Sequence, residues 1–140
     1  MSKKPDCELC DRPGGSLVWQ DDTCRVVLVA DFDYPGFCRV VWNRHVKEMT
    51  DLAAAERQHL MATVFAVEEA VREVMHPDKI NLASLGNMTP HLHWHVIPRF
   101  MHDKHFPQPV WGTPQRDGKR TLAPDLASRL VDRVRSKLSN

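Results

Sequence analysis

Three histidines alternate with apolar residues in the segment His-Leu-His-Trp-His-Val-Ile, residues 91–97. Alternate side chains of a β-strand point to opposite faces, so His91, His93 and His95 are expected on one face, about 7 Å apart, with the apolar residues entering the core. Imidazole is neutral or charged near pH 7 and serves as nucleophile, acid, base or metal ligand. A lone histidine is usually structural. Three on one face are not explained in that way, because Thr, Val or Lys at these positions would stabilise an ordinary strand better. The row therefore predicts a chemical site.

Two kinds of chemistry fit a row of imidazoles. Two histidines at i and i+2 on a strand are a workable pair of zinc ligands. A neutral imidazole can also attack phosphorus to form a phosphoramidate that water later cleaves, which divides one hard step into two easier ones. In that case we expect His93 to be the nucleophile, because it has a neighbour on each side. His95 would then bind phosphate oxygens, and His91 would orient the phosphate or the leaving group.

With Pro98 and Arg99 after it, the row resembles the signature of the histidine triad (HIT) superfamily of nucleotide hydrolases and transferases. The resemblance covers roughly residues 7–100 and assigns the nucleophile to the same central position, His93. It implies a HIT-like fold, a small-molecule nucleotide as substrate and a homodimer whose sheets join. No cofactor is expected to be required for the chemistry.

An earlier segment carries part of the resemblance and two departures from it. Pro35-Gly36 leads into an apolar run and then to His45, as in the family pattern. Phe37, however, stands where the family usually has histidine, and Trp42-Asn43 stand where it usually has Pro-Lys. These departures concern accessory contacts and leave the row of histidines intact.

Polar residues outside the row are candidates for nucleotide binding. Asn81, the Gly86-Asn87 pair and Thr89 resemble the loop with which the family holds a nucleotide phosphate. Backbone amides of this loop and its side chains can bond phosphate or ribose hydroxyls, although a Gly-Asn pair by itself ordinarily marks only a turn. The resemblance also implies an acceptor for the ribose hydroxyls in the loop after the second strand, for which we favour Asp31.

Four residues form a candidate zinc site. Cys7 and Cys10 make a Cys-x-x-Cys pair, and His45 and His91 complete a Cys₂His₂ set if the fold brings them together. Some bacterial proteins that resemble this chain carry a structural zinc there. Such a site would tie the N-terminal segment to the sheet and remove His91 from contact with phosphate. The alternative is a pair of buried free thiols beside an ordinary turn.

Hydrophobic periodicity predicts the elements that position these residues. A period of two and β-rich composition predict five strands, at 17–20, 25–30, 37–42, 79–85 and 92–99. Apolar residues at helical spacing predict a long helix over 52–75, with Thr50 or Asp51 as its cap and Pro77 as its stop. The expected fold is α+β, an antiparallel five-stranded sheet with one long central helix and a C-terminal helix.

The remainder of the chain is expected to complete one domain, residues 1–140, whose core spans about 7–100. Prolines and scarce periodicity predict a loop over 101–123. Its Trp111 is as readily a packing anchor as a residue that stacks on a base, and we place it outside the catalytic set. Fourfold spacing of apolar residues predicts a final helix over 124–138, with Pro124 in its first position.

Composition excludes some classes of partner. The 140 residues include 19 basic and 18 acidic ones, a formal net charge of +1, so no strong field draws the chain to a nucleic acid polymer or a membrane surface. No apolar run approaches the roughly eighteen residues of a membrane span, and the start lacks the core of a signal peptide. We therefore expect a cytoplasmic protein without a disulfide framework.

Three functions remain. The first is a nucleotide hydrolase that cleaves a dinucleoside polyphosphate or a nucleoside phosphoramidate through a nucleotidyl-His93 intermediate. The second is nucleotidyl transfer to another phosphate, which shares the covalent step. His95 favours hydrolysis, because the transferase branch that resembles this family carries Gln at the position of His95. The third is a nucleotide- or zinc-binding regulatory module with little turnover.

Overall fold

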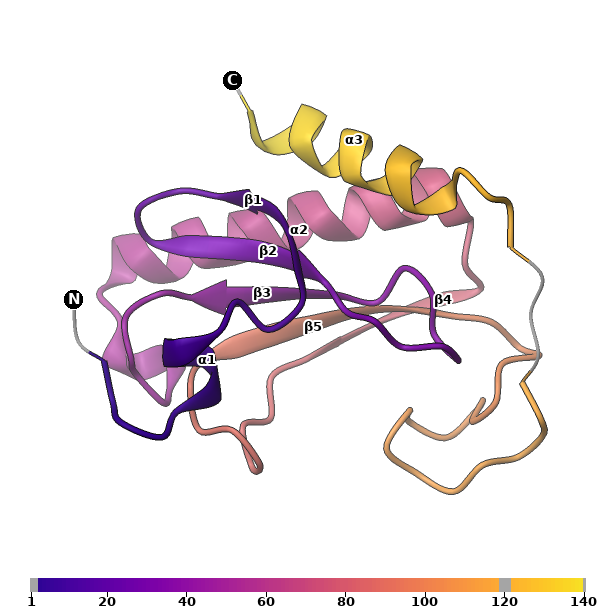
Figure 1. The fold of residues 1–140 in the computed structure, drawn as a ribbon, viewed down its shortest axis with the longest axis horizontal. Coiled ribbons are helices and arrows are strands. Elements are labelled where there is room, and N and C mark those ends of the chain that lie inside the picture. Colours follow the sequence, from indigo (N-terminus) through magenta and orange to yellow (C-terminus); the bar gives the residue numbers. More distant parts are fainter. Residues whose placement is uncertain (1–2, 119–121, 140) are drawn as a thin grey trace.

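The computed structural model describes residues 3–118 and 122–139. In chain order the elements are α1 (Glu8–Asp11), β1 (Ser16–Gln20), β2 (Cys24–Leu28), β3 (Cys38–Trp42), the 3₁₀ turn η1 (Met49–Asp51), α2 (Ala54–Met75), β4 (Lys79–Ala83), β5 (His93–Arg99) and α3 (Leu126–Leu138) (Figure 1). The strands form an antiparallel sheet in the order β1-β2-β3-β5-β4. The predicted α+β fold, with its long central and C-terminal helices, is confirmed.

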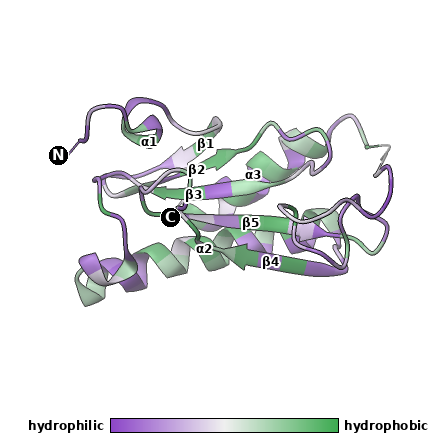
Figure 2. Cartoon of the chain, turned by 90° about the horizontal axis from the view of Figure 1, so that it is seen from below, coloured by the Kyte–Doolittle hydropathy of each residue, from purple (hydrophilic) through white to green (hydrophobic). Residues whose placement is uncertain are grey.

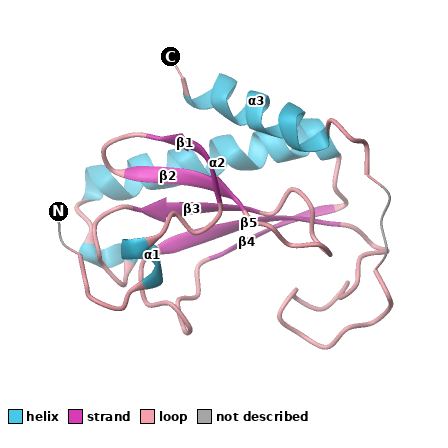
Figure 3. Ribbon diagram, in the orientation of Figure 1, coloured by secondary structure: helices cyan, strands magenta, loops and turns pink. Residues whose placement is uncertain are grey.

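The two long helices lie side by side on one face of the sheet (Figures 1 and 3). Every second residue of the central strands points to them, which follows from the period of two in the sequence. The main core gathers the strand residues Val26, Val40 and Val96 with Leu60, Val64, Val67 and Val71 of α2. The opposite face, which we call the open face, carries no long helix and is overlain by the N-terminal segment and by loops.

The register of the strands brings the candidate residues to the open face. His93 lies opposite Val41 of β3, and His95 lies opposite Arg39 of β3 and Ala83 of β4. Figure 2 shows that β5 is hydrophilic at its beginning and hydrophobic in its middle. Two imidazoles therefore stand on central strands of a sheet whose other face packs against the main hydrophobic core.

The main helix begins later than its predicted caps. Thr50 and Asp51 lie in η1, and the N-cap of α2 is Ala53, whose backbone N–H donates to the Glu56 carboxylate at 2.8 Å. The N3 carboxylate thus serves as the cap without a polar N-cap side chain. The helix ends at Met75, and its C-cap His76 takes the left-handed conformation immediately before the predicted stop.

Other boundaries differ from the prediction by one or two residues. Strands β2 and β4 each end two residues early, β3 and β5 each begin one residue late, and the four-residue α1 has no counterpart in the prediction. Pro124 lies in a turn before α3 rather than in its first position. No helix in 3–118 or 122–139 is long and apolar enough to cross a membrane.

Candidate active site

His93 and His95 stand together on the open face. Their side chains are buried, with relative exposures of 7% and 6%, and their rings meet edge to face with centroids 4.8 Å apart. His91 is not on the same strand, because β5 begins at His93. The prediction of three histidines on one strand is therefore wrong for the first of them, whose position follows a turn in which its N–H donates to the Thr89 carbonyl at 2.8 Å.

Backbone carbonyls fix the tautomers of two of these histidines. The Nδ1 of His93 lies 2.6 Å from the carbonyl oxygen of His91. A carbonyl can only accept, so Nδ1 carries the proton and Nε2 keeps a lone pair. His91 has the reverse arrangement, since its Nε2 lies 2.6 Å from the carbonyl oxygen of Trp42 and its Nδ1 is left without a proton. The two rings therefore offer lone pairs from opposite nitrogens.

The surroundings keep both imidazoles of the strand neutral. Burial lowers the pKa of His95 to about 3, and the positive charge of Arg39 adds to the effect. Burial also lowers the pKa of His93, against its hydrogen bond to the His91 carbonyl. Arg39 lies opposite His95 in the sheet, its positive charge acts on both histidines, and its Nη1 donates to the Gly14 carbonyl at 2.7 Å. Neutral imidazoles next to a guanidinium suit nucleophilic attack on an anionic substrate.

Aromatic rings enclose His95. The ring of Phe37 meets it edge to face at 5.4 Å, and the ring of Trp111 lies 5.1 Å away at 60°. Its Nδ1 is buried and has no partner within the described residues. A buried polar nitrogen without a partner is costly, so this atom is a candidate to bond a substrate oxygen. The contact with Trp111 was not predicted, because it joins a strand to a loop with no periodic pattern.

The loop between β4 and β5 contains most of the predicted nucleotide-binding residues. Gly86 turns the chain at φ +80°, Asn87 is exposed, and Thr89 accepts from the His91 backbone as above. Ser84, which was not predicted, donates from Oγ to the His93 carbonyl at 2.7 Å and so holds the start of β5.

Asn81 and Asp31 are bonded elsewhere. The Oδ1 of Asn81 accepts from Arg99 Nη1 at 2.7 Å, and Asp31 accepts from the Asp33 backbone N–H at 3.0 Å. Asp31 also lines an apolar pocket between its loop and the start of α3, together with Phe32. Neither residue is joined to the imidazoles by a hydrogen bond in the described part of the chain, so a substrate would have to bridge them.

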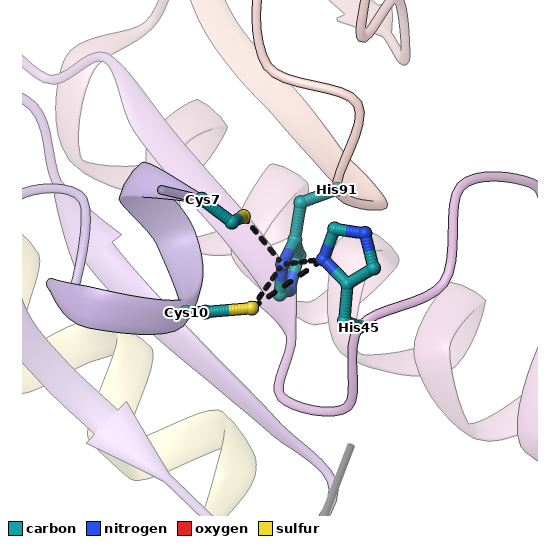
Figure 4. A group of neighbouring side chains, drawn as sticks. All are labelled: Cys7, Cys10, His45 and His91. Atoms are coloured by element: carbon teal, nitrogen blue, oxygen red, sulfur yellow. Dashed lines mark hydrogen bonds between the residues drawn. The ribbon is translucent and has the colours of Figure 1, made fainter. Parts of the chain in front are cut away.

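The four predicted zinc ligands converge at one end of the open face (Figure 4). The Nδ1 of His91 lies 3.4 Å from Cys7 Sγ, 3.5 Å from Cys10 Sγ and 3.2 Å from His45 Nδ1. All four ligand atoms are within 4.8 Å of one another. Edges of this length fit a tetrahedron with zinc bonds of about 2.0–2.3 Å. The deprotonated Nδ1 of His91 faces the thiols, and its Nε2–H is held by a carbonyl, the usual support of a metal-bound histidine.

Arg25 holds the segment that carries the two cysteines. Its guanidinium donates to the carbonyls of Leu9, at 2.7 Å, and Pro13, at 3.0 Å, and to the Asn43 side chain at 2.8 Å. The short helix α1 is thereby fixed over β2 and β3. This role was not predicted, because an arginine inside a strand pattern reads as an ordinary exposed side chain.

Comparisons by sequence find one domain family. The model of the HIT domain matches residues 14–102. Proteins named AP-4-A phosphorylase from Mycobacterium tuberculosis, strains CDC 1551 / Oshkosh and H37Rv, are 34% identical over 104 residues, which cover 66% of this chain and 53% of each relative. The chain thus spans about half the length of the curated relatives it matches.

Comparisons by structure find the same fold. A histidine triad protein of Bradyrhizobium japonicum aligns with a TM-score of 0.74 and 28% identity, covering 90% of this chain and 92% of that one. A histidine triad protein of Marinobacter aquaeolei VT8 aligns with a TM-score of 0.73 and 27% identity, covering 94% and 96%. A zinc-bound histidine triad family protein of Mycobacterium smegmatis, at 20% identity and a TM-score of 0.61, covers 96% of this chain and 94% of its own, and shares the fold.

Proposed function

The chain belongs to the HIT family, and from this premise we propose that it cleaves a nucleoside phosphate bond through a covalent nucleotidyl-His93 intermediate. The substrate is a dinucleoside polyphosphate or a nucleoside phosphoramidate. One observation carries the proposal: the His91 carbonyl fixes the proton of His93 on Nδ1 and leaves the Nε2 lone pair for phosphorus.

In the first step Nε2 of His93 attacks the nucleoside-bearing phosphorus, and the bond from phosphorus to the leaving group breaks with its electron pair. The ring then bears a proton on Nδ1 and phosphorus on Nε2, and it is cationic. The His91 carbonyl stabilises this cation, because its hydrogen bond becomes charge-assisted as the charge develops. His95 bonds a non-bridging oxygen from its unpaired nitrogen.

In the second step a water molecule attacks the same phosphorus from the side that the leaving group has vacated. The phosphorus–nitrogen bond breaks, its electrons return to Nε2 of His93, and the water proton ends on the nucleoside monophosphate or bulk water. His95, neutral and within ring contact of His93, is placed to order the attacking water.

Transfer to inorganic phosphate is the second candidate, and the curated relatives named AP-4-A phosphorylase favour it. Phosphate would then replace water in the second step and form a nucleoside diphosphate. The two acceptors are distinguished by the products of diadenosine tetraphosphate with and without added phosphate: AMP with ATP indicates water, and ADP with ATP indicates phosphate.

The proposal is tested by turnover of diadenosine tetraphosphate and adenosine phosphoramidates by the parent, His93→Ala and His102→Ala. His102 is an exposed histidine of the loop after β5 and serves as the control. We expect His93→Ala to lose at least about a thousandfold in rate, as nucleophile variants do, and His102→Ala to retain it. A parent that binds nucleotide without turnover would instead support the regulatory module.

We also propose that Cys7, Cys10, His45 and His91 hold a structural zinc, which the closeness of their four ligand atoms supports. With no position left for a substrate, the ion would stabilise the N-terminal segment and take no part in the chemistry. Purified protein should contain about one zinc per chain, and Cys10→Ser should lower both the zinc content and the unfolding temperature. Zinc-free parent protein with unchanged thermal stability after zinc addition would contradict the assignment.

A further inference from the structure

Trp111 is a large apolar side chain that lies against the candidate active site without being buried there. Its ring contacts His95 at 5.1 Å, yet 52% of the residue remains exposed. His95 in turn contacts His93, so two ring contacts separate the indole from the proposed nucleophile. A single exposed aromatic residue is ordinary at a protein surface, but the ring of Trp111 also contacts a histidine of the candidate active site.

We propose that Trp111 is the stacking surface for the nucleobase of the substrate and so contributes to substrate binding and specificity. The inference rests on the proposed function, because it takes the substrate to be a nucleotide whose phosphate lies at His93. A ribose separates phosphate from base in such a molecule, as the ring of His95 separates His93 from Trp111. Every base has a π-face, so an indole binds it without a hydrogen-bonded match.

The loop that carries Trp111 is anchored to the end of β5 by a buried ion pair. Arg99, at the end of β5, donates from Nε and Nη2 to the Asp103 carboxylate at 2.8 and 3.0 Å, and both side chains are almost fully buried. The same guanidinium reaches the Gln108 carbonyl at 2.7 Å. Arg116 donates to the Phe106 carbonyl at 2.9 Å and to the Asp103 carbonyl. The loop is therefore fixed by charge-assisted bonds on both sides of the tryptophan.

Apolar contacts fix the loop next to the tryptophan itself. Val110 packs against the buried cluster of Tyr34, Phe37 and Ile97, and Gly112 closes a turn by donating to the Pro109 carbonyl at 2.8 Å. Trp111 lies between these two fixed points. An aromatic surface that is held before the ligand arrives loses little conformational entropy when it binds.

The test is calorimetric titration of the 140-residue chain with nucleoside monophosphates, which are not expected to react, and with ribose 5-phosphate, which has no base. The variants are Trp111→Ala, Trp111→Phe and Phe65→Ala. Phe65 is a control of similar exposure, 50%, on α2 and so on the other side of the sheet. Thermal unfolding of each variant checks its fold.

We expect Trp111→Ala to weaken monophosphate binding about tenfold or more, to leave ribose 5-phosphate binding unchanged, and Trp111→Phe to recover most of the loss. Equal weakening of both ligands would overturn the inference and leave Trp111 as a residue that only positions His95. Unchanged binding of both would overturn it as well. A parent that binds no monophosphate would overturn the stacking proposal and leave the hydrolase to be decided by the turnover assay. Trp111-dependent binding without turnover would support stacking and reject only the hydrolase.

Discussion

His91 is bonded at four points, of which the first is its backbone N–H, a donor to the Thr89 carbonyl. Its ring Nδ1 faces the two thiols and His45, its Nε2–H donates to the Trp42 carbonyl, and its own carbonyl accepts from His93. One residue thus belongs to the proposed zinc cluster through its side chain and to the proposed nucleophile through its backbone. In the proposal with zinc bound, the carbonyl of His91 rather than its side chain serves the nucleophile, and the side-chain role at the phosphate stays an untested prediction.

His95 is predicted to act mainly in the second step, in which water attacks the nucleotidyl intermediate. The substitution His95→Gln keeps an N–H donor for the phosphate oxygen but removes the imidazole that orders water. We expect formation of the nucleotidyl intermediate to persist while its hydrolysis slows at least about a hundredfold, the usual contribution of a positioned acid or base. Single-turnover assays that follow each step separately would check this. Equal slowing of both steps would contradict the assigned role.

Some residue assignments follow from sequence and others do not. The alternation in residues 91–97 correctly placed His93 and His95 on one face, since β5 keeps its period through them. The same alternation continues into His91, where the chain is already turning, so periodicity gave no warning that this residue leaves the strand. The contact between His95 and Trp111 depends on a loop path that no local pattern encodes.

At the scale of elements, the conformation of the loop after β5 is held by the carboxylate of Asp103. This carboxylate accepts from Arg99 and from the backbone N–H groups of Phe100 and Phe106, at 3.0 and 2.8 Å. Burial opposes its ionisation, but these bonds outweigh burial and hold its pKa well below the ordinary range. It therefore stays charged near neutral pH.

Replacing Asp103 by Asn should be strongly destabilising. The substitution leaves the Arg99 cation buried without a counter-charge, and we expect a loss of about 3 kcal/mol in the free energy of unfolding. Chemical denaturation of Asp103→Asn beside Asp117→Asn, an exposed residue of the same loop, would measure it. A loss no larger than that of the control would show that the loop is held mainly by its apolar contacts.

Asp21, in the turn between β1 and β2, is expected to make the free energy of unfolding depend on pH. Burial of Asp21 opposes ionisation, but bonds from the backbone of Cys24 and Thr23, the Thr23 hydroxyl and His59 outweigh it and lower its pKa to about 2. Because this is below the ordinary value of 3.8, the carboxylate stabilises the fold above pH 3.8, and the contribution is lost as the pH falls toward 2.

Asp21→Asn should therefore unfold more easily than the parent at pH 7, with a difference that shrinks between pH 4 and pH 2. Urea denaturation across that range would follow it, with Asp22→Asn, the exposed neighbour, as control. A difference that persists unchanged at pH 2 would mean that Asp21 acts through packing rather than through its charge.

The elements themselves were largely predictable, and their ends were not. Strand and helix positions follow from periods of two and of 3.6, and the sheet and both long helices appear where expected. The start of α2 was missed because its cap is formed by the Glu56 side chain reaching back to Ala53, so the Thr50 and Asp51 signal marked a separate 3₁₀ turn. Helix α1 is too short for any periodicity.

For the whole molecule, the sheet has one edge that is covered and one that is open. At the β1 edge, Arg135 of α3 donates to the Val18 carbonyl at 2.8 Å. Strand β4 forms the other edge, and within the described residues it pairs only with β5. An open edge offers a row of backbone groups to another chain. We therefore propose that two copies join through β4, in line with the expected homodimer.

Multi-angle light scattering should give a particle of twice the 16.1 kDa chain mass. Dissociation should require dilution, since the mass of a reversible dimer depends on concentration. A particle of 16.1 kDa at every concentration would contradict a homodimer. The oligomeric state was implied by the family resemblance alone, because one chain's periodicity says nothing about what pairs with its edge.

The central claim is that His93 becomes covalently attached to the nucleotide, and it is tested most directly by the intact mass of the protein after rapid quenching. The parent, His93→Ala and His93→Gly are mixed with dinucleoside polyphosphates and adenosine phosphoramidates. We predict a nucleotide-sized increase in mass on the parent that is absent from both variants. A parent that forms no adduct and no product with any substrate, or an adduct that persists in both variants, would contradict it.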